Sequence, residues 1–494
     1  MSPTLLLLIV FLYFILILSV SYITGKGSDN ESFFIGNRNS NWMLVAFGMI
    51  GSSLSGVTFV SVPGAVGKDN FGYLQITLGY VIGYIVIAYI LLPLYYRLKL
   101  TSIYSYLRKR MGRVSEKTGA TIFIVSRLVG ATARLYLVVH ILQIIILDKF
   151  GVPFVVTTLI IIAMILLYTY EGGVKTIVWT DTLQTTCMLA GLVICTLYIL
   201  NHMDLSVVES WHALEAKGYT QVFGTDPMSS GYFVKQIIAG AFITITMTGI
   251  DQEMMQKSLS VTHLKDSQKN MVTLGFIMLF VIGLFLYLGG LLYLFGEQEG
   301  ITATGDALFP EIAIEHMPAF ISFIFIIALI SALFPSADGA MTALTSSFCI
   351  DILGINDKDW EEKKRKKVRK QVHLIVAVSF VLMCILFKII DDGSMIWLIL
   401  KLAGFTYGPL LGLFVFGIFT KRKVKDSWVP YICILAPALS YLIDHYQSKI
   451  FGDFQVGLEL LVINGALTFL GLLLASKKNV LNEDLESFDE VKTK

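Results

Sequence analysis

The chain has 494 residues, of which 55% are apolar and 15% charged, and its mean hydropathy is +0.73. A soluble globular chain usually carries about 25% charged residues, so this composition excludes a large soluble enzyme, a disordered chain and a disulfide-stapled scaffold. The formal net charge of +2 gives no indication of a nucleic-acid partner. The five cysteines all lie in apolar runs without a C-x-x-C pair, and we interpret them as buried apolar residues.

Apolar runs long enough to cross a bilayer recur from one end of the chain to the other. A hydrocarbon core about 30 Å thick needs roughly 20 helical residues. We therefore predict an all-α polytopic membrane protein. Its approximately thirteen transmembrane helices are expected at 4–23, 41–66, 72–96, 119–147, 152–169, 176–200, 232–256, 271–296, 317–349, 371–390, 394–419, 427–446 and 456–476. The first run lacks a basic n-region and a small-residue cleavage site, so we expect a retained helix rather than a signal peptide.

The lysines and arginines orient these helices. With the N-terminus outside, 29 of the 38 basic residues fall on the inner side, among them those from Lys257 to Lys269 and from Lys358 to Lys370. Cytoplasmic loops carry such an excess of basic residues. We expect a multi-pass protein of the plasma (inner) membrane with its N-terminus outside and its C-terminus cytoplasmic. The polar segment Asn479–Lys494 is expected to be disordered.

Two of the predicted helices carry interruptions. The second contains Gly48-Met-Ile-Gly-Ser-Ser-Leu-Ser-Gly-Val-Thr58, and the seventh contains Thr244-Ile-Thr-Met-Thr248-Gly249. Glycines and hydroxyl residues weaken a helix, and irregular backbone at membrane depth occurs only where protein or a water-filled cavity satisfies it. The alternative is that the small residues only permit close helix packing.

Each interrupted helix opens a block of five predicted helices, at 41–200 and 232–419. Because five is odd, the second block is inserted upside down relative to the first. Such a 5+5 inverted repeat with broken first helices is typical of secondary transporters with a site near the midplane. The remaining segments are a first peripheral helix (1–24), two C-terminal helices (427–476) and a cytoplasmic tail (477–494).

Charged side chains within the apolar runs are costly and indicate function. Asp181 lies in the sixth predicted helix and Asp338 in the ninth. Arg127 and Arg134 are seven residues apart in the fourth, and therefore share one face. Asp181 and Arg127 also lie near the expected cytoplasmic boundary, where simple hydration is the alternative explanation.

Six segments, in order along nearly the whole chain, carry a family resemblance. They are Leu54-Ser-Gly-Val-Thr-Phe59 with Pro63, Thr169-Tyr-Glu-Gly-Gly173, Val178-Trp-Thr-Asp181, Asp251-Gln-x-x-x-Gln256-Lys257, Ser346-Ser-Phe-Cys-Ile-Asp351 and Tyr407-Gly-Pro-Leu-Leu-Gly-Leu-Phe-Val-Phe-Gly-Ile-Phe-Thr-Lys-Arg422. This set resembles the sodium:solute symporter family, and within it most the bacterial sodium/sialic acid symporters. The resemblance implies a fold like that of the leucine transporter, alternating access, and sodium as the coupling ion without an organic cofactor.

The resemblance also implies a sodium site between the second and ninth helices. Its oxygens would come from the carbonyls of Gly51, Leu54 and Ala332 and from positions Pro335 and Ser336. The family commonly has a hydroxyl residue where this chain has Pro335, so one hydroxyl ligand is missing.

Some members of the family hold a second sodium between an aspartate that matches Asp181 and serines on the ninth helix. Those serine positions are Pro335, Asp338 and Gly339 in this chain. We hypothesise that Asp181 and Asp338 form a second cation site.

Arg134 falls where the sialic acid symporters carry an arginine that clamps the substrate carboxylate, and a bidentate guanidinium suits a carboxylate. The alternative is an internal ion pair of Arg134 with Asp338 or another acid. The other expected substrate contacts are the side chains of Ser53, Ser55, Thr58, Gln75 and Thr77. Gly56 stands where those transporters have a serine, and Thr77 where they have a glutamine.

We predict a sodium-coupled secondary symporter that imports a small organic solute, such as the carboxylate-bearing sugar sialic acid. The alternatives are a sodium/sugar, monocarboxylate or amino-acid symporter, and a membrane sensor that does not transport. The sequence shows no nucleophile–base pair or metal ligand set, so an enzyme is not expected, and it has no G-x-x-x-x-G-K-[ST] loop, so ATP-driven pumping is not expected. The expected partners are the solute, sodium and the lipid bilayer, with no nucleic acid and no obligate protein.

Overall fold

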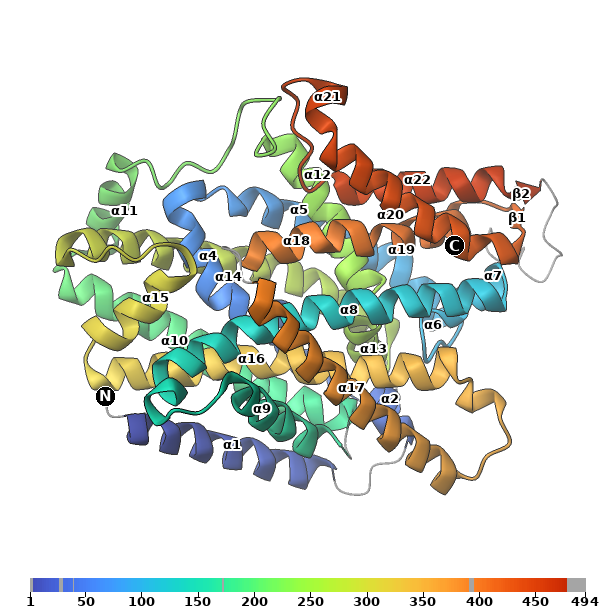
Figure 1. Cartoon of the computed structure of the whole chain (residues 1–494), viewed down its shortest axis with the longest axis horizontal. Helices are drawn as coiled ribbons and strands as arrows, with labels where there is room; N and C mark the ends of the chain where they lie inside the picture. The colour runs from blue at the N-terminus through green and yellow to red at the C-terminus, as the bar shows by residue number, and fades with distance from the viewer. Residues whose placement is uncertain (1–2, 26–29, 39, 171–172, 391–394, 478–494) are drawn as a thin grey trace.

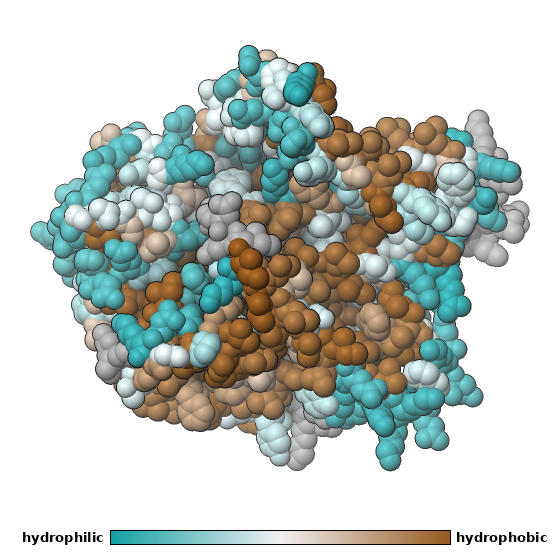
Figure 2. Space-filling model, viewed as in Figure 1, coloured by the Kyte–Doolittle hydropathy of each residue, from teal (hydrophilic) through white to brown (hydrophobic). Residues whose placement is uncertain are grey.

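A computed structural model describes residues 3–25, 30–38, 40–170, 173–390 and 395–477. These residues form a bundle in which many of the long helices run roughly along the long axis of the molecule (Figure 1). Apolar residues gather over the middle of the visible face, and hydrophilic residues gather toward its two ends (Figure 2). Within the described ranges, eight helices are long and apolar enough to cross a membrane, or up to eleven if each of three bent pairs is one span.

Among the described residues, the first half of the chain contains one bent helix pair, α3 and α4. Its helices are α1 (Pro3–Gly25), α2 (Asn30–Ile35), α3 (Trp42–Ser53), α4 (Gly56–Asp69), α5 (Tyr73–Val86), α6 (Leu92–Arg97), α7 (Ser105–Arg110), α8 (Arg113–Leu142), α9 (Phe154–Thr169), α10 (Val174–His202) and α11 (Val207–Ala216).

The second half contains the longest helix, α14, and a two-stranded antiparallel ribbon near the described C-terminal end. Its elements are α12 (Phe233–Thr244), α13 (Gln252–Leu259), α14 (Leu264–Glu299), α15 (Leu308–Glu311), α16 (Ala319–Ser347), α17 (Glu362–Ile390), α18 (Met395–Thr406), α19 (Gly408–Phe419), β1 (Lys423–Val424), α20 (Val429–His445), α21 (Gln447–Phe451), α22 (Leu460–Leu474) and β2 (Ser476–Lys477).

Each range predicted as a transmembrane helix overlaps at least one helix of the described residues, and eight to eleven helices there are long and apolar enough to be spans. The predicted interruptions are confirmed, since α3 and α4 meet at 55° and the helix Phe233–Gly249 meets α13 at 64°. A third bend of 47° separates α18 from α19, where a single straight span was predicted. The expected tail after residue 477 lies outside the described residues.

Small residues set the distance between the helices that surround the breaks. A Cβ on Gly240 of α12 would overlap the carbonyl of Ile76 on α5, and a Cβ on Gly79 would lie 2.8 Å from the backbone nitrogen of Ala241. α5 and α12 therefore pack backbone to backbone, as small residues allow between membrane helices. α10 packs against both α3 and α16, and this places the first break beside α16.

Candidate functional site

The break between α3 and α4 leaves backbone carbonyls without helical partners. Leu54 has φ −91° and ψ 96°, and its N–H still donates to the carbonyl of Ile50 at 2.7 Å. Helical bonding resumes where the N–H of Phe59 donates to the carbonyl of Ser55 at 3.1 Å. Among the described residues, no backbone N–H donates across the break to the carbonyls of residues 51–54. These oxygens are free to bind a cation.

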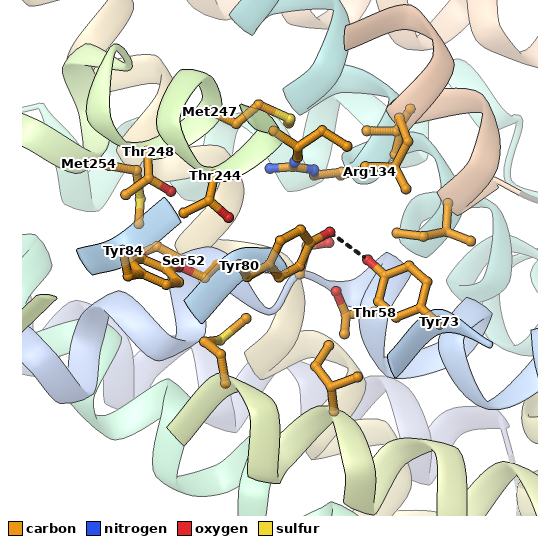
Figure 3. A pocket seen from close by; sticks show the side chains of 18 of the residues that line it. Ser52, Thr58, Tyr73, Tyr80, Tyr84, Arg134, Thr244, Met247, Thr248 and Met254 are labelled. Carbon is orange, nitrogen blue, oxygen red and sulfur yellow. Dashed lines mark hydrogen bonds between the residues drawn. The ribbon is translucent and has the colours of Figure 1, made fainter. Parts of the chain in front are cut away.

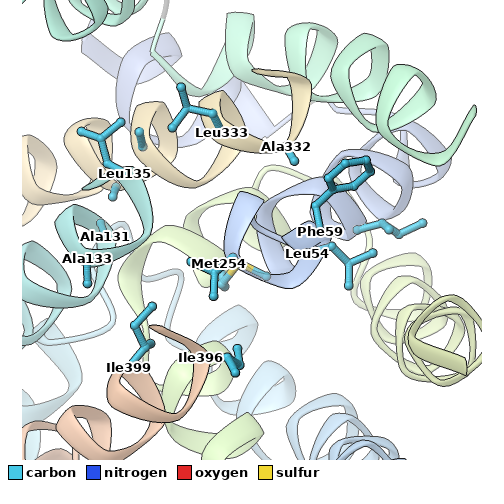
Figure 4. Packing of buried hydrophobic residues seen from close by; sticks show 14 of the residues in the cluster. Leu54, Phe59, Ala131, Ala133, Leu135, Met254, Ala332, Leu333, Ile396 and Ile399 are labelled. Carbon is cyan, nitrogen blue, oxygen red and sulfur yellow. The ribbon is translucent and has the colours of Figure 1, made fainter. Parts of the chain in front are cut away.

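Helix α16 lies directly against this break. A Cβ on Gly51 would lie 3.6 Å from Cγ of Pro335, and one on Gly56 would lie 3.9 Å from the carbonyl carbon of Ala332. Figure 4 shows Ala332 beside Leu54 and Phe59 of the broken segment. α16 stays helical through Pro335, so the proline removes one N–H donor without ending the helix. The structure thus brings together the α3–α4 and α16 residues that were predicted to hold sodium.

One hydroxyl at this contact was missed from the sequence. A Cβ on Gly51 would overlap Oγ1 of Thr185, which lies on α10 and is fully buried. Oγ1 of Thr185 has no hydrogen-bond partner in the described part of the chain. Oγ of Ser336, the predicted hydroxyl ligand, donates to the carbonyl of Leu333 at 3.0 Å. Thr185 sits four residues after Asp181, a helical spacing that places both on one face of α10.

A buried cavity of about 90 Å³ opens beside the break. Three predicted residues line it from the broken segment, namely Ser53, Ser55 and Thr58. Three tyrosines of α5 that were not predicted also line it, namely Tyr73, Tyr80 and Tyr84. The hydroxyls of Tyr73 and Tyr80 are 3.1 Å apart and hydrogen-bonded (Figure 3). Thr244 and Thr248 contribute two further hydroxyls from the second interrupted segment.

Arg134 reaches the same cavity from α8. Figure 3 shows its side chain between Met247 and the group formed by Thr244 and Tyr80. Its guanidinium forms no hydrogen bond or ion pair with any described residue. Arg134 forms no ion pair with Asp338 among the described residues. Oδ2 of Asp338 instead accepts a hydrogen bond from the Tyr168 hydroxyl at 2.7 Å. A guanidinium with five N–H donors therefore faces the cavity.

Arg127 lies two helical turns before Arg134 on α8, and its guanidinium is paired with acidic side chains. Its guanidinium forms a short ion pair with Glu253 and lies 3.7 Å from Oδ2 of Asp251. Asp251 also accepts a hydrogen bond from the hydroxyl of Tyr407 at 3.0 Å and caps the first turn of α13. Arg127 is only 2% exposed, so hydration at the membrane boundary does not explain it. Through these two carboxylates, Arg127 holds the first turn of α13, directly after the bend that separates α13 from the helix Phe233–Gly249.

Lys257 is the largest departure from the sequence prediction. It was counted with a cytoplasmic loop, but the structure buries it at 2% exposure near the end of α13. Its Nζ donates to Oδ2 of Asp181 at 2.8 Å and to Oγ of Ser52 at 2.5 Å. Asp181 is fully buried, so its hydration at the boundary is also excluded. The spacing of Glu253 and Lys257, four residues apart on one helix, was the signal available in the sequence.

The structure does not bring Gln75 and Thr77 to the cavity. The amide of Gln75 donates to the carbonyl of Gly72 and accepts from the N–H of Gly224, and it lines a separate cavity of about 210 Å³. The hydroxyl of Thr77 donates to the carbonyl of Tyr73 in its own helix. Trp397 lines that separate cavity too, and its indole N–H donates to Asp69 at 3.0 Å.

The profile of the Sodium:solute symporter family matches residues 33–426. This chain belongs to the sodium:solute symporter family. The match confirms the family predicted from the sequence motifs. Members of this family couple transport to sodium, and this coupling applies to the present chain, called the symporter below. Among the described residues, no group of three or more His, Cys, Asp and Glu side chains is arranged to hold a metal ion. The oxygens at the break remain as candidate sodium ligands.

Several relatives resemble the symporter over most of its length. It is 23% identical to the "Sodium/sialic acid symporter SiaT" of Proteus mirabilis over 96% of this chain and 95% of the relative. It is 26% identical to the mouse "Sodium-coupled monocarboxylate transporter 1" over 80% of this chain and 65% of the relative. A solved structure of a Na+-coupled sialic acid symporter in a substrate-bound outward-open state aligns with a TM-score of 0.80 at 19% identity, covering 96% of this chain and 99% of that chain. This likeness shows the fold.

Gly56→Ser is expected to destabilise the symporter. A Cβ at residue 56 would overlap Cγ2 of Val138 on α8, and overpacking a filled core typically costs about 1–3 kcal/mol. The variant should melt at a lower temperature in a detergent thermal-shift assay, and Gly56→Ser combined with Val138→Ala should recover most of the loss. If the single variant melts like the unmodified protein, the close contact does not explain the glycine.

Arg127→Gln is expected to be more damaging. It leaves the buried carboxylates of Asp251 and Glu253 without their cation, and breaking such a pair costs about 3–5 kcal/mol. The matched control is Lys217→Gln, which breaks a 2.6 Å pair with Glu297 between side chains that are 51% and 49% exposed. Pairs of that kind contribute about 0–1 kcal/mol. Equal melting temperatures for the two variants would contradict the assignment of Arg127 as a buried structural cation.

Proposed function

We propose that the symporter imports a small organic solute bearing a carboxylate, driven by sodium, and that Arg134 binds this carboxylate. The observation that carries the proposal is the guanidinium of Arg134, which faces the central cavity and has no acidic partner among the described residues. A cation in a membrane interior is costly unless something pairs with it. An anionic substrate supplies the missing partner, and the hydroxyls of Ser53, Ser55 and Thr58 are placed to bind its polar groups.

Sodium would bind at the break beside this cavity. The carbonyls of Gly51, Leu54 and Ala332 and the hydroxyl of Ser336 are the proposed ligands, together with position Pro335. We add Thr185, whose buried hydroxyl has no partner in the described chain and lies against Gly51 and near Pro335. It would supply the hydroxyl that Pro335 cannot. Sodium at this point ties α16 and α10 to the broken segment that lines the cavity, and this couples the ion to the solute.

The transport cycle we propose follows from the repeat. The shorter apolar helices α9 and α22, added to the eleven above, support a count of thirteen spans. We propose that the inverted repeats are 41–200 and 232–419. The segments 1–24 and 427–476 flank them. We propose a plasma-membrane location, and the distribution of basic residues supports an orientation with the N-terminus outside and the segment 477–494 inside. Alternating access then moves one set of helices against the other about the two breaks.

Two solute classes fit the proposal. The relatives of greatest coverage support sialic acid. The cavity supports a smaller monocarboxylate, because its volume of about 90 Å³ is well below the roughly 300–1,000 Å³ of pockets for drug-sized ligands. A nine-carbon sugar acid requires the cavity to widen, whereas lactate or pyruvate does not.

A thermal-shift screen tests the coupling and the solute class together. Purified protein is incubated with sialic acids, monocarboxylates, sugars or amino acids, in sodium or in choline buffer. We expect a carboxylate to raise the melting temperature in sodium only, because ligands that bind the folded state stabilise it. Counterflow of the same carboxylate in proteoliposomes should follow. Stabilisation without counterflow would favour a sensor, and stabilisation by neutral sugars alone would contradict the role of Arg134.

A further inference from the structure

A network of buried charges lies beside the proposed sodium site, and one of its members, Arg127, also lines the solute cavity. It joins α8, α10 and α13 through Arg127, Asp181, Asp251, Glu253 and Lys257, all at most 2% exposed. Arg127 pairs with Asp251 and Glu253, as described above. Lys257 pairs with Asp181 and lies 3.6 Å from Oε1 of Glu253. Each cation of the network thus lies between two carboxylates.

The ammonium of Lys257 occupies an oxygen-lined position. Its neighbours are Oδ2 of Asp181 at 2.8 Å, Oγ of Ser52 at 2.5 Å and Oε1 of Glu253. The hydroxyl of Ser52 lies 3.1 Å from the same carboxylate oxygen of Asp181, to which it donates. Carboxylates and hydroxyls are the ligands that hard cations such as sodium take in proteins. The ammonium of Lys257 therefore occupies a position whose oxygen atoms are of the kind that bind sodium.

Gly339 on α16 makes room for this arrangement. A Cβ on Gly339 would lie 3.0 Å from Nζ of Lys257 and would overlap Oε1 of Glu253. Any side chain at residue 339 would displace the ammonium or its carboxylate neighbour. The neighbouring Asp338 is fully buried, and its Oδ1 has no hydrogen-bond partner among the described residues. Oδ1 of Asp181 has none either, so the ammonium of Lys257 engages Asp181 through Oδ2 alone.

We propose that Lys257 is a tethered cation that takes the place of a second, diffusible sodium ion at Asp181. The ammonium neutralises Asp181 and links α13 to α10 and to Ser52 at the end of α3, so the second site needs no ion from solution. The symporter then couples its solute to a single sodium, bound at the α3–α4 break. This inference rests on the proposed sodium coupling, and it sets the stoichiometry of that coupling.

The test compares the sodium dependence of the unmodified protein with that of Lys257→Gln. Both are reconstituted in proteoliposomes, and uptake of the carboxylate found in the screen is measured against sodium concentration. A Hill coefficient rises at most to the number of interacting sites, so we expect about 1 for the unmodified protein and a value approaching 2 for Lys257→Gln. The variant should also melt with a steeper dependence on sodium concentration in the absence of solute. Lys265→Gln, which removes an exposed lysine of α14, is the matched control.

Two further variants keep the test decisive if Lys257→Gln folds poorly. Gly339→Ser should displace the ammonium while retaining its charge, and should raise the sodium dependence of the melting temperature. Asp181→Asn combined with Lys257→Gln removes both charges of the pair. In this double variant the additional sodium dependence of the melting temperature should be lost. A Hill coefficient near 2 in the unmodified protein, or one unchanged by Lys257→Gln, would overturn the tethered cation and leave sodium coupling intact. Uptake by the unmodified protein that ignores sodium would overturn the proposed function itself.

Discussion

Arg134→Gln is expected to raise the KM for the carboxylate substrate by at least tenfold while leaving the folded protein intact. The guanidinium faces the cavity without an acidic partner among the described residues, so its removal leaves no protein carboxylate unpaired. The bound substrate, in contrast, loses a charge-assisted pair. Removing one partner of a buried, hydrogen-bonded charge pair costs about 2–5 kcal/mol, and each 1.4 kcal/mol is a factor of about ten in affinity.

Arg134→Lys separates charge from geometry. An ammonium keeps the positive charge but loses the planar pair of donors that matches a carboxylate, so this variant should lie between Arg134→Gln and the unmodified protein. The measurement is sodium-driven uptake of sialic acid, lactate and pyruvate in proteoliposomes, with the melting temperature as a check on folding. Unchanged uptake by Arg134→Gln, at an unchanged melting temperature, would exclude Arg134 as the carboxylate-binding residue.

The sequence was sufficient to predict the two broken helices and the cavity beside them. Single glycines such as Gly79 and Gly240 can serve close helix packing. Glycines clustered with several hydroxyl residues at membrane depth indicate a broken helix or a cavity lining, and the segments around Gly51 and Thr248 have this pattern. The bend at Tyr407 was missed although Gly408 and Pro409 mark it, because the flanking runs are uniformly apolar and read as one span.

Lys257 could not be placed from hydropathy. α13 is a short polar helix, and polarity in a membrane protein normally indicates a loop in water. In this fold the charged side chains of α13 are stabilised by ion pairs rather than by water, because Arg127 and Lys257 pair with three carboxylates in a buried network. Such a network depends on side chains from helices that are distant in the sequence. A pattern within one helix predicts at most the pair formed by Glu253 and Lys257.

The placement of Gln75 and Thr77 failed for a different reason. Both lie on α5, the same helix as the cavity-lining Tyr73 and Tyr80, and one residue of register decides which face a side chain takes. Residues 73, 80 and 84 follow a helical repeat of seven and four, and residue 75 falls outside it. Residue 77 lies on the same face, but its hydroxyl donates to the carbonyl of Tyr73 in its own helix. The tyrosines therefore carry the inner face of α5, and Gln75 turns to Gly224 instead.

Thr185→Val is expected to weaken the apparent affinity for sodium by roughly tenfold without a large change in stability. The substitution is nearly isosteric and removes only a hydroxyl that has no partner within the described residues. Losing a polar contact to a charged group costs about 1.5–3 kcal/mol, and the position of Pro335 leaves few other hydroxyls to replace it. Ser336→Ala should show a similar loss, because both hydroxyls are proposed to face the same ion from α10 and α16.

Thr186→Val provides the matched control for this prediction. Thr186 follows Thr185 directly, but its side chain is exposed and its hydroxyl donates to the carbonyl of Thr182 in its own helix at 2.8 Å. The sodium concentration that gives half-maximal uptake should be raised in Thr185→Val and Ser336→Ala and unchanged in Thr186→Val. If Thr185→Val matches Thr186→Val while Ser336→Ala is impaired, sodium binds at the break without Thr185. The hydroxyl lost at Pro335 would then have no replacement from α10, and the site would depend on the carbonyls and Ser336 alone.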